Sequence, residues 1–212
     1  MTRPFSTLAA TLLMIGAGTV FAASSVDLTV KGLITPSACT PMLSQGGMAD
    51  YGKIAAKDLQ ENQATPLPTT TFQLSVNCEA ATLFALNGVD NRAGSASSPG
   101  DDSYGLGFIN ETERLGDFLI VLTNYRADNQ PVSKLASRDN GATWIENSED
   151  AIWMRSRLTA FGNNAGGNWA PIAIMTLNSD LTIHPSIAAA SGLTLTQEQP
   201  IDGSATLELR YL

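Results

Sequence analysis

Apolar residues recur at every second position in several short segments of this chain, and that spacing constrains its fold more than any other feature. Residues 26–30, 72–76 and 205–211 each alternate apolar and polar side chains. Residues 118–123 are almost continuously apolar, as expected for a strand that is buried on both faces. A period of two residues is that of a β-strand, whereas a helix repeats every 3.6 residues. The chain is therefore predicted to consist mainly of strands.

Turn-forming residues separate the predicted strands. They occur at Asn87-Gly88, Asp139-Asn140-Gly141, Gly166-Gly167 and Asp202-Gly203, and such combinations are typical of tight turns. Residues 55–63 have helix-forming composition, but Pro66 follows closely, so at most one or two helical turns are expected there. Many short strands joined by turns predict an all-β fold, namely a β-sandwich with elaborated loops.

The first 22 residues have the composition of a secretory signal peptide. Arg3 is the only charged residue before Asp27, and an apolar run at 8–21 ends in small residues that suit cleavage after Ala22 or Ala23. The run is marginal for a membrane span, which needs roughly 20 apolar residues. We therefore expect an exported protein without a membrane span after cleavage, in which residues 23–212 form a single domain.

Cys39 and Cys78 are the only cysteines of the chain. An even cysteine count in an oxidising compartment indicates a disulfide. Closing a loop of about 40 residues would stabilise the fold by roughly 4 kcal/mol in the chain-entropy model. The spacing excludes a CxxC redox motif, and the chain lacks the additional ligands that a zinc site would need. We therefore expect a structural disulfide between these two residues.

The charged residues argue against nucleic-acid binding and against catalysis. Twelve basic and 20 acidic residues give a net charge of −8, whereas a nucleic-acid partner requires a basic surface. The single histidine, His184, lies at the end of a predicted strand, where a structural or surface role is expected. Acidic pairs such as Asp101-Asp102 and Glu149-Asp150 lack the ligand series of a calcium loop. We therefore expect no catalytic residue, no cofactor and no metal.

Three segments together resemble the pilin subunits of the chaperone–usher pathway. Residues 30–39 read Val-Lys-Gly-Leu-Ile-Thr-Pro-Ser-Ala-Cys, with an apolar-Lys-Gly core just before the first cysteine. Residues 71–78 form an alternating strand that leads to the second cysteine, and residues 203–212 resemble the final pilin strand with Tyr211 as its penultimate aromatic. All three occur in the pilin order behind a signal peptide, in a chain with exactly the two cysteines.

The resemblance implies a fold, a function and a set of partners. Pilins are similar to immunoglobulin sandwiches that lack their last strand, and a periplasmic chaperone or the next fimbrial subunit fills the resulting groove with a strand. The chain would then be a fimbrial or fimbrial-like subunit, handled by a chaperone and an usher in the periplasm or in a surface fimbrium of a Gram-negative bacterium. The disulfide would join the first strand to a neighbouring one. The groove would be lined by Ala205, Leu207, Leu209, Tyr211 and Leu212.

The sequence departs from the pattern of a polymerising pilin at its N-terminus. Cleavage after Ala22 or Ala23 leaves only Ala23-Ser24-Ser25 before the predicted strand at 26–30, which is shorter than the free extension of a major pilin. This length favours a minor or terminal subunit, or a fimbrial-like periplasmic protein.

Two other functions stay open at this stage. Trp144 and Trp169 lie in segments rich in Asn and Gly, and such aromatic rings pack on the apolar faces of sugars. This composition would suit a glycan-binding tip adhesin. Alternatively, the last strand belongs to a complete sandwich, and the chain is a self-complemented periplasmic protein that does not polymerise.

Overall fold

The computed structural model of the protein describes residue 29 and residues 38–212. The predicted signal peptide at 1–22 and the predicted strand at 26–30 therefore lie outside the described residues, apart from residue 29. Residues 38–212 belong to one compact unit, and the description that follows concerns that unit by itself.

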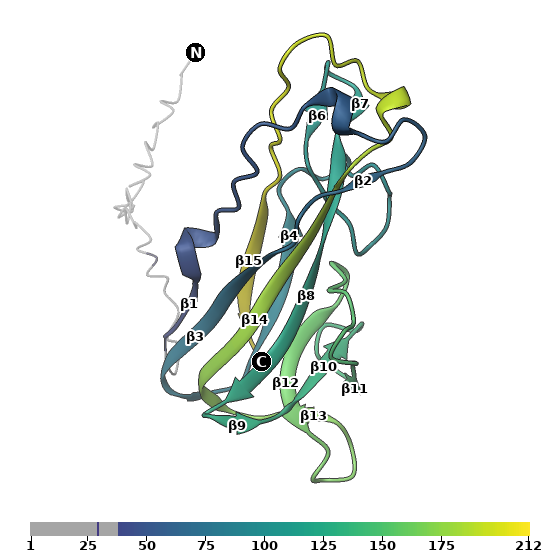
Figure 1. Cartoon of the computed structure of the whole chain (residues 1–212). Coiled ribbons are helices and arrows are strands. Elements are labelled where there is room, and N and C mark those ends of the chain that lie inside the picture. Colours follow the sequence, from purple (N-terminus) through teal and green to yellow (C-terminus); the bar gives the residue numbers. More distant parts are fainter. Residues whose placement is uncertain (1–28, 30–37) are drawn as a thin grey trace, which may run out of the picture. The chain divides into compact units, whose positions relative to one another are not determined.

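The first sheet is antiparallel and has the order β1-β3-β14-β8-β5. Its long members β3, β14 and β8 run side by side through the fold (Figure 1). Two short strands extend the sheet, because β2 pairs with β14 and β9 pairs with β8. The bounds are β1 (Cys39–Leu43), β2 (Thr65–Pro66), β3 (Thr70–Thr82), β5 (Tyr104–Gly105), β8 (Gly116–Ala127), β9 (Gln130–Pro131) and β14 (Ile174–Ile187).

The second sheet is also antiparallel and has the order β11-β10-β12-β4-β15, with β13 paired to β12. Its strands are β4 (Phe84–Asp90), β10 (Ser133–Ser137), β11 (Ile145–Glu146), β12 (Leu158–Asn163), β13 (Ala170–Pro171) and β15 (Ala205–Tyr211). A separate hairpin joins β6 (Phe108–Ile109) to β7 (Glu113–Arg114). Single helical turns occur at η1 (Ser44–Gly47), η2 (Ala56–Asp58) and η3 (Ala190–Gly192).

One hydrophobic core joins the two sheets. Phe72 of β3, Leu122 of β8 and Leu177 of β14 belong to the same buried cluster as Leu86 of β4 and Phe161 of β12. Because each strand alternates its side chains between its two faces, every second residue of these strands enters this core. The predicted all-β fold with antiparallel sheets is confirmed.

The disulfide prediction is confirmed as well. Cys39 and Cys78 lie directly opposite each other in the β1–β3 register, and their sulfur atoms are bonded. The bond fastens the first described strand to the long central sheet.

The continuously apolar segment 118–123 is part of β8, but it is not fully buried on both faces. Phe118, Ile120 and Leu122 are buried, whereas Leu119 and Val121 are half-buried. The reason is that only one face of this sheet meets the second sheet. Residue 121 is nevertheless covered at its strand edge, where it forms an isolated bridge with Ile152.

Two of the predicted turns are wrong, and both involve glycines that pack against side chains. Strand β4 runs straight through Asn87-Gly88, and the chain breaks between β3 and β4 at Leu83 instead. Gly88 is needed there because the Tyr104 hydroxyl occupies the space that a Cβ would fill. Gly203 lies in an extended segment and contacts the side chains of Leu106 and Phe118.

The other predicted turns are confirmed. Asn140 and Gly141 have φ values of 57° and 93°, and Gly167 has a φ of 86°, so these residues adopt the left-handed backbone of tight turns. The expected helical turn within 55–63 is η2. His184 lies inside the long strand β14 rather than at its end, and its side chain is exposed.

Candidate partner-strand groove

The last strand, β15, is an edge strand whose inner face is incompletely covered. Within residues 38–212 it pairs only with β4, in a register that sets Ala205 opposite Asp90 and Tyr211 opposite Phe84. Ala205, Leu207 and Leu209 point toward the core but are only half-buried. A completed layer would bury such residues fully, so the alternation of β15 indicates an open side of the core.

The backbone groups of β15 divide between its two edges. Asn91 N–H donates to the Ser204 carbonyl at 3.0 Å, and Leu212 N–H donates to the Leu83 carbonyl at 3.1 Å. In an antiparallel ladder every second residue bonds to its partner, so the even-numbered residues of β15 face β4. The free edge therefore presents the N–H and C=O groups of Ala205, Leu207, Leu209 and Tyr211.

Strand β1 supplies a second edge that pairs with none of the described strands, and this edge faces β15. Glu79 N–H donates to the Ala38 carbonyl at 3.1 Å, so by the same alternation Cys39, Pro41 and Leu43 direct their backbone groups away from β3. Cys39 N–H donates instead to the Tyr211 hydroxyl at 3.0 Å. This bond shows that the free edge of β1 looks toward β15.

A groove with a volume of about 230 Å³ runs between these two edges. We call it the partner-strand groove. One wall is the end of β1 at Leu43 with the segment that follows it, and the other is the start of β15, at Ala205 and Leu207, with the segment that precedes it. The floor is the inner face of the first sheet. The apolar residues that line it are Leu43, Ala49, Phe72, Leu106, Phe118, Ile120, Leu181, Ile183, Pro185, Ile201, Ala205 and Leu207.

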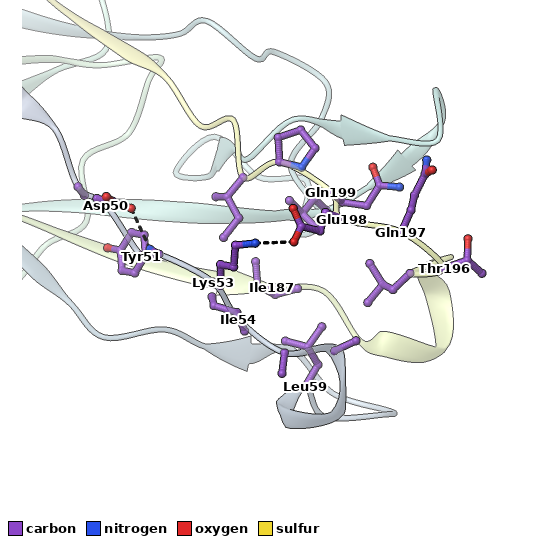
Figure 2. A pocket seen from close by; sticks show the side chains of 18 residues that line it. Asp50, Tyr51, Lys53, Ile54, Leu59, Ile187, Thr196, Gln197, Glu198 and Gln199 are labelled. Carbon is purple, nitrogen blue, oxygen red and sulfur yellow. Dashed lines mark hydrogen bonds and ion pairs between the residues drawn. The ribbon is translucent and has the colours of Figure 1, made fainter.

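The groove continues into a larger pocket, which we call the Lys53 pocket. The two share Ala49, Tyr51 and Ile201 in their lining, and the pocket has a volume of about 780 Å³. Its walls are the segments 49–56 and 195–201, with Leu59 and Ile187 at its base (Figure 2). The side chains of Lys53 and Glu198 extend toward each other from opposite walls and form an ion pair at 2.6 Å. Because both side chains are about 85% exposed, the pair contributes little to stability.

A second ion pair holds the segment that leads into β15. Arg92 donates through Nε and Nη2 to the carboxylate of Asp202, at 2.9 and 2.7 Å, and Nε also reaches the Asp202 carbonyl. The hydrogen bond from Arg92 lowers the pKa of the Asp202 carboxyl below its usual value. Asp202 N–H in turn donates to the Leu106 carbonyl at 3.1 Å. The β15 wall is therefore fixed in position without a strand on its free side.

Only some of the predicted groove residues line the groove. Ala205 and Leu207 line the groove, and Leu209 packs against the core beside it. Tyr211 is 43% exposed and reaches across to Cys39, while Leu212 is 46% exposed and lies over Gly141. Sequence reasoning missed the opposite wall, formed by Leu43, Ala49 and Tyr51, because the residues from 39 to 51 carry no regular apolar spacing.

The two tryptophans of the predicted ligand surface are not brought together. Trp144 is half-buried against Leu158, at the start of β12, and its indole N–H donates to the Gly141 carbonyl at 3.0 Å. Trp169 precedes β13, which pairs with the far end of β12 at Asn163. The third tryptophan, Trp153, is 3% exposed and belongs to the core.

In the part of the chain that the structure describes, no three His, Cys, Asp or Glu side chains gather in a way that could hold a metal ion. Among residues 38–212, no helix is long and apolar enough to cross a membrane. The disulfide is compatible with an exported protein.

Comparison with known proteins gives one family and two relatives. Residues 28–126 match the model of a family described as "Protein of unknown function (DUF1120)". The chain is 26% identical over 239 residues to Protein GltF of Escherichia coli (strain K12), with 94% of each chain covered. It is 23% identical over 224 residues to the "Uncharacterized protein YhcF" of the same strain, covering 90% of this chain and 92% of that protein. The family match includes β1 but ends before β15, whereas both relatives are similar along nearly the whole chain.

Proposed function

We propose that this protein is a non-catalytic fimbrial or fimbrial-like subunit that receives a strand from another protein in its partner-strand groove. The observation that carries the proposal is the groove itself. Two strand edges, on β1 and β15, face each other across an apolar floor that is continuous with the core. An extended peptide would bond to both edges through its backbone while its alternate side chains fill the floor.

The order of the strands supports an immunoglobulin-like fold of the pilin type. In immunoglobulin sandwiches, strands A, B, E and D form one sheet, and strands C, F and G belong to the other. The order β1-β3-β14-β8 corresponds spatially to the first set, and β4-β15 corresponds to C and F. Within the described part of the chain no strand occupies the position of G beside β15. That vacant position is the groove.

The N-terminal segment is suited to serve as the inserted strand of a second copy. The first strand that the structure describes begins at Cys39, so residues 23–38 precede it in the mature chain. The expectation that only three residues precede the first strand rested on a strand at 26–30, outside the described range. Val26, Leu28 and Val30 alternate with polar residues, as an inserted strand requires. At about 3.3 Å per residue, residues 24–35 would span about 40 Å, enough for the seven residues of β15 and the pocket beyond.

The groove also explains why a periplasmic chaperone and an usher would be partners. An open strand edge beside exposed core residues is an aggregation hazard until it is covered. A chaperone strand would cover it before assembly, and the usher would exchange that strand for the segment of the next subunit. Removing residues 207–212 takes away most of the β15 edge and should abolish co-purification with the chaperone.

Peptide binding by the full mature chain tests the proposal. Its own segment is disabled by Val26→Asp, Leu28→Asp and Val30→Asp, and the probe is a synthetic peptide of residues 24–35. We expect the peptide to raise the melting temperature in a concentration-dependent way, because it binds the folded state alone. A peptide with the same three substitutions is the control. The absence of stabilisation by the first peptide would contradict the proposal.

Two matched variants of β15 locate the binding. Leu207→Arg places a charge in the groove, whereas Glu208→Arg places the same side chain on the exposed face of the same strand. We expect the first to abolish peptide binding and the second to change affinity by less than about threefold. Equal losses in both variants would argue against the groove as the binding site.

The unsubstituted mature chain separates polymerisation from self-complementation. If the segment fills the groove of a second copy, gel filtration will show concentration-dependent oligomers. A stable monomer that ignores the added peptide would instead favour the self-complemented protein. A glycan-binding adhesin is not favoured, because Trp144 is committed to packing and Trp169 lies at the other end of β12.

A further inference from the structure

Tyr211 differs from the other inward-facing residues of β15 in reaching strand β1, beyond the residues that line the groove. Ala205, Leu207 and Leu209 end in side chains that stop at the floor. The Tyr211 side chain continues to β1, where its hydroxyl accepts a hydrogen bond from Cys39 N–H at 3.0 Å. Cys39 is the first residue of β1 and Tyr211 is the last of β15. The contact therefore joins the two walls at one end, which we call the Cys39 end.

The same contact removes a backbone donor that an inserted strand would use. On the free edge of β1, Cys39 N–H is taken by Tyr211, and Pro41 has no N–H. Leu43 is then the first residue of this edge that can donate to an inserted strand. A strand that extended as far as Cys39 would meet an aromatic ring and find no donor. The Cys39 end of the groove is thus closed in steric terms, and the edge of β1 offers an inserted strand no N–H donor there.

The opposite end is open. There the groove runs into the Lys53 pocket, whose volume of about 780 Å³ exceeds that of the groove. The Lys53–Glu198 pair spans this pocket, but its two side chains are exposed and not held by packing. Additional residues of an inserted strand can therefore be accommodated at this end.

We propose that Tyr211 is a positioning residue that stops the inserted strand at the Cys39 end and thereby sets its register. Register matters because a shift by one residue would turn every apolar side chain of the strand away from the floor. The inference rests on the proposed function, and it names Tyr211 as the residue that determines which register of an inserted strand the groove accepts. It also favours a second copy as donor, since the chain's own segment leaves Cys39 at the closed end and would have to displace Tyr211 to enter.

Peptides extended at one end test the stop. The protein is the full mature chain with Val26→Asp, Leu28→Asp and Val30→Asp, and the probes are the 24–35 peptide and two versions that carry four added Gly-Ser residues, at either the N- or the C-terminus. We expect the extension that lies at the Cys39 end of the groove to weaken binding at least tenfold. The extension that lies at the Lys53 pocket should leave binding unchanged. Tyr211→Ala should tolerate both extensions, while Tyr211→Phe, which keeps the ring, should restore most of the discrimination.

The possible results separate the two claims. Failure of the unextended peptide to bind the Tyr211-intact protein would overturn the proposed function and this inference with it. Binding with equal tolerance of both extensions, or discrimination that persists in Tyr211→Ala, would overturn the stop alone. Amide hydrogen exchange at Cys39 checks that the contact with Tyr211 was altered as intended. This amide should exchange faster in Tyr211→Phe and in Tyr211→Ala. Unchanged exchange in both variants would contradict the closed end, even if Tyr211→Ala proved too unstable for peptide titration.

Discussion

Gly88 of β4 lies directly against the hydroxyl of Tyr104, so that a Cβ at residue 88 would overlap the phenolic oxygen. The Tyr104 side chain is fully buried, and its hydroxyl makes no hydrogen bond to any of the described residues. Burial also raises the pKa of this phenol, which therefore stays protonated in the folded protein. An unpaired buried hydroxyl and a glycine inside a strand are both unfavourable, and here the hydroxyl fills the space that the glycine leaves free.

We predict that Gly88→Ala and Tyr104→Phe are coupled. Gly88→Ala alone should lower the free energy of unfolding by about 1–3 kcal/mol, because the core is overpacked. Tyr104→Phe alone should be neutral or slightly stabilising, since it removes an unsatisfied polar group. Urea unfolding of the double variant should recover at least half of the loss caused by Gly88→Ala. Strictly additive effects would show that the two residues do not compete for this space.

Lys134 should make stability depend on pH in the alkaline range. The residue is 2% exposed, and its ammonium group donates to the carbonyls of Leu122, Glu149 and Ala151 at 3.2, 2.8 and 3.2 Å. Burial lowers the pKa of this amine to about 8, although Glu149 and Asp150 act in the opposite direction. The unfolded chain, with an ordinary lysine pKa of about 10.4, then holds more protons than the folded protein between these values.

The free energy of unfolding contributed by Lys134 should therefore rise as pH increases from about 8 to about 10, with a slope approaching 1.4 kcal/mol per pH unit. The contribution is constant below this window, where both states are protonated. It is measured as the difference between the unchanged protein and Lys134→Met in urea unfolding at several pH values, which cancels the titration of other groups. A difference that is flat across the window, or that falls, would contradict the lowered pKa.

The disulfide should stabilise both the fold and one wall of the groove. Replacing Cys39 and Cys78 by alanine should lower the free energy of unfolding by roughly 4 kcal/mol, because the open chain gains conformational freedom when it unfolds. The same variant should bind the 24–35 peptide more weakly, since β1 then loses its covalent bond to β3 and keeps only noncovalent contacts, such as its pairing with β3 and the hydrogen bond to Tyr211. The reduced form of the unchanged protein is the matched control. A loss below about 1 kcal/mol would indicate that β1 is held mainly by other contacts.

Strands that are buried on one face could be predicted from the sequence. The alternation in 72–76 and 205–211 marked β3 and β15 correctly, because a half-buried strand imposes a period of two on its side chains. The same alternation indicated that Ala205 and Leu207 share one face of β15, and in the structure both line the groove. The disulfide followed from a count of two cysteines in a chain whose first 22 residues have the composition of a signal peptide.

Features that depend on long-range contacts could not be predicted in this way. A glycine signals a turn or a close approach equally well, and only the position of Tyr104 decides that Gly88 belongs inside β4. The wall formed by Leu43, Ala49 and Tyr51 was not predicted. The chain from 44 to 51 forms no strand, so its apolar residues do not recur at a regular spacing. Tyr211 was predicted to line the groove, but the structure places it beyond the lining residues, in a contact with Cys39 that joins residues 172 positions apart.

The most direct test of the central claim is amide hydrogen exchange along β15 with and without the 24–35 peptide, in the full mature chain whose own segment is disabled. The amides of Leu207 and Leu209 point to the free edge, whereas those of Thr206 and Glu208 face β4 and act as internal controls. If the groove receives a strand, the peptide will slow exchange at Leu207 and Leu209 by at least tenfold and leave the already protected controls little changed. Exchange at Leu207 and Leu209 that stays fast at saturating peptide would contradict strand addition at this edge.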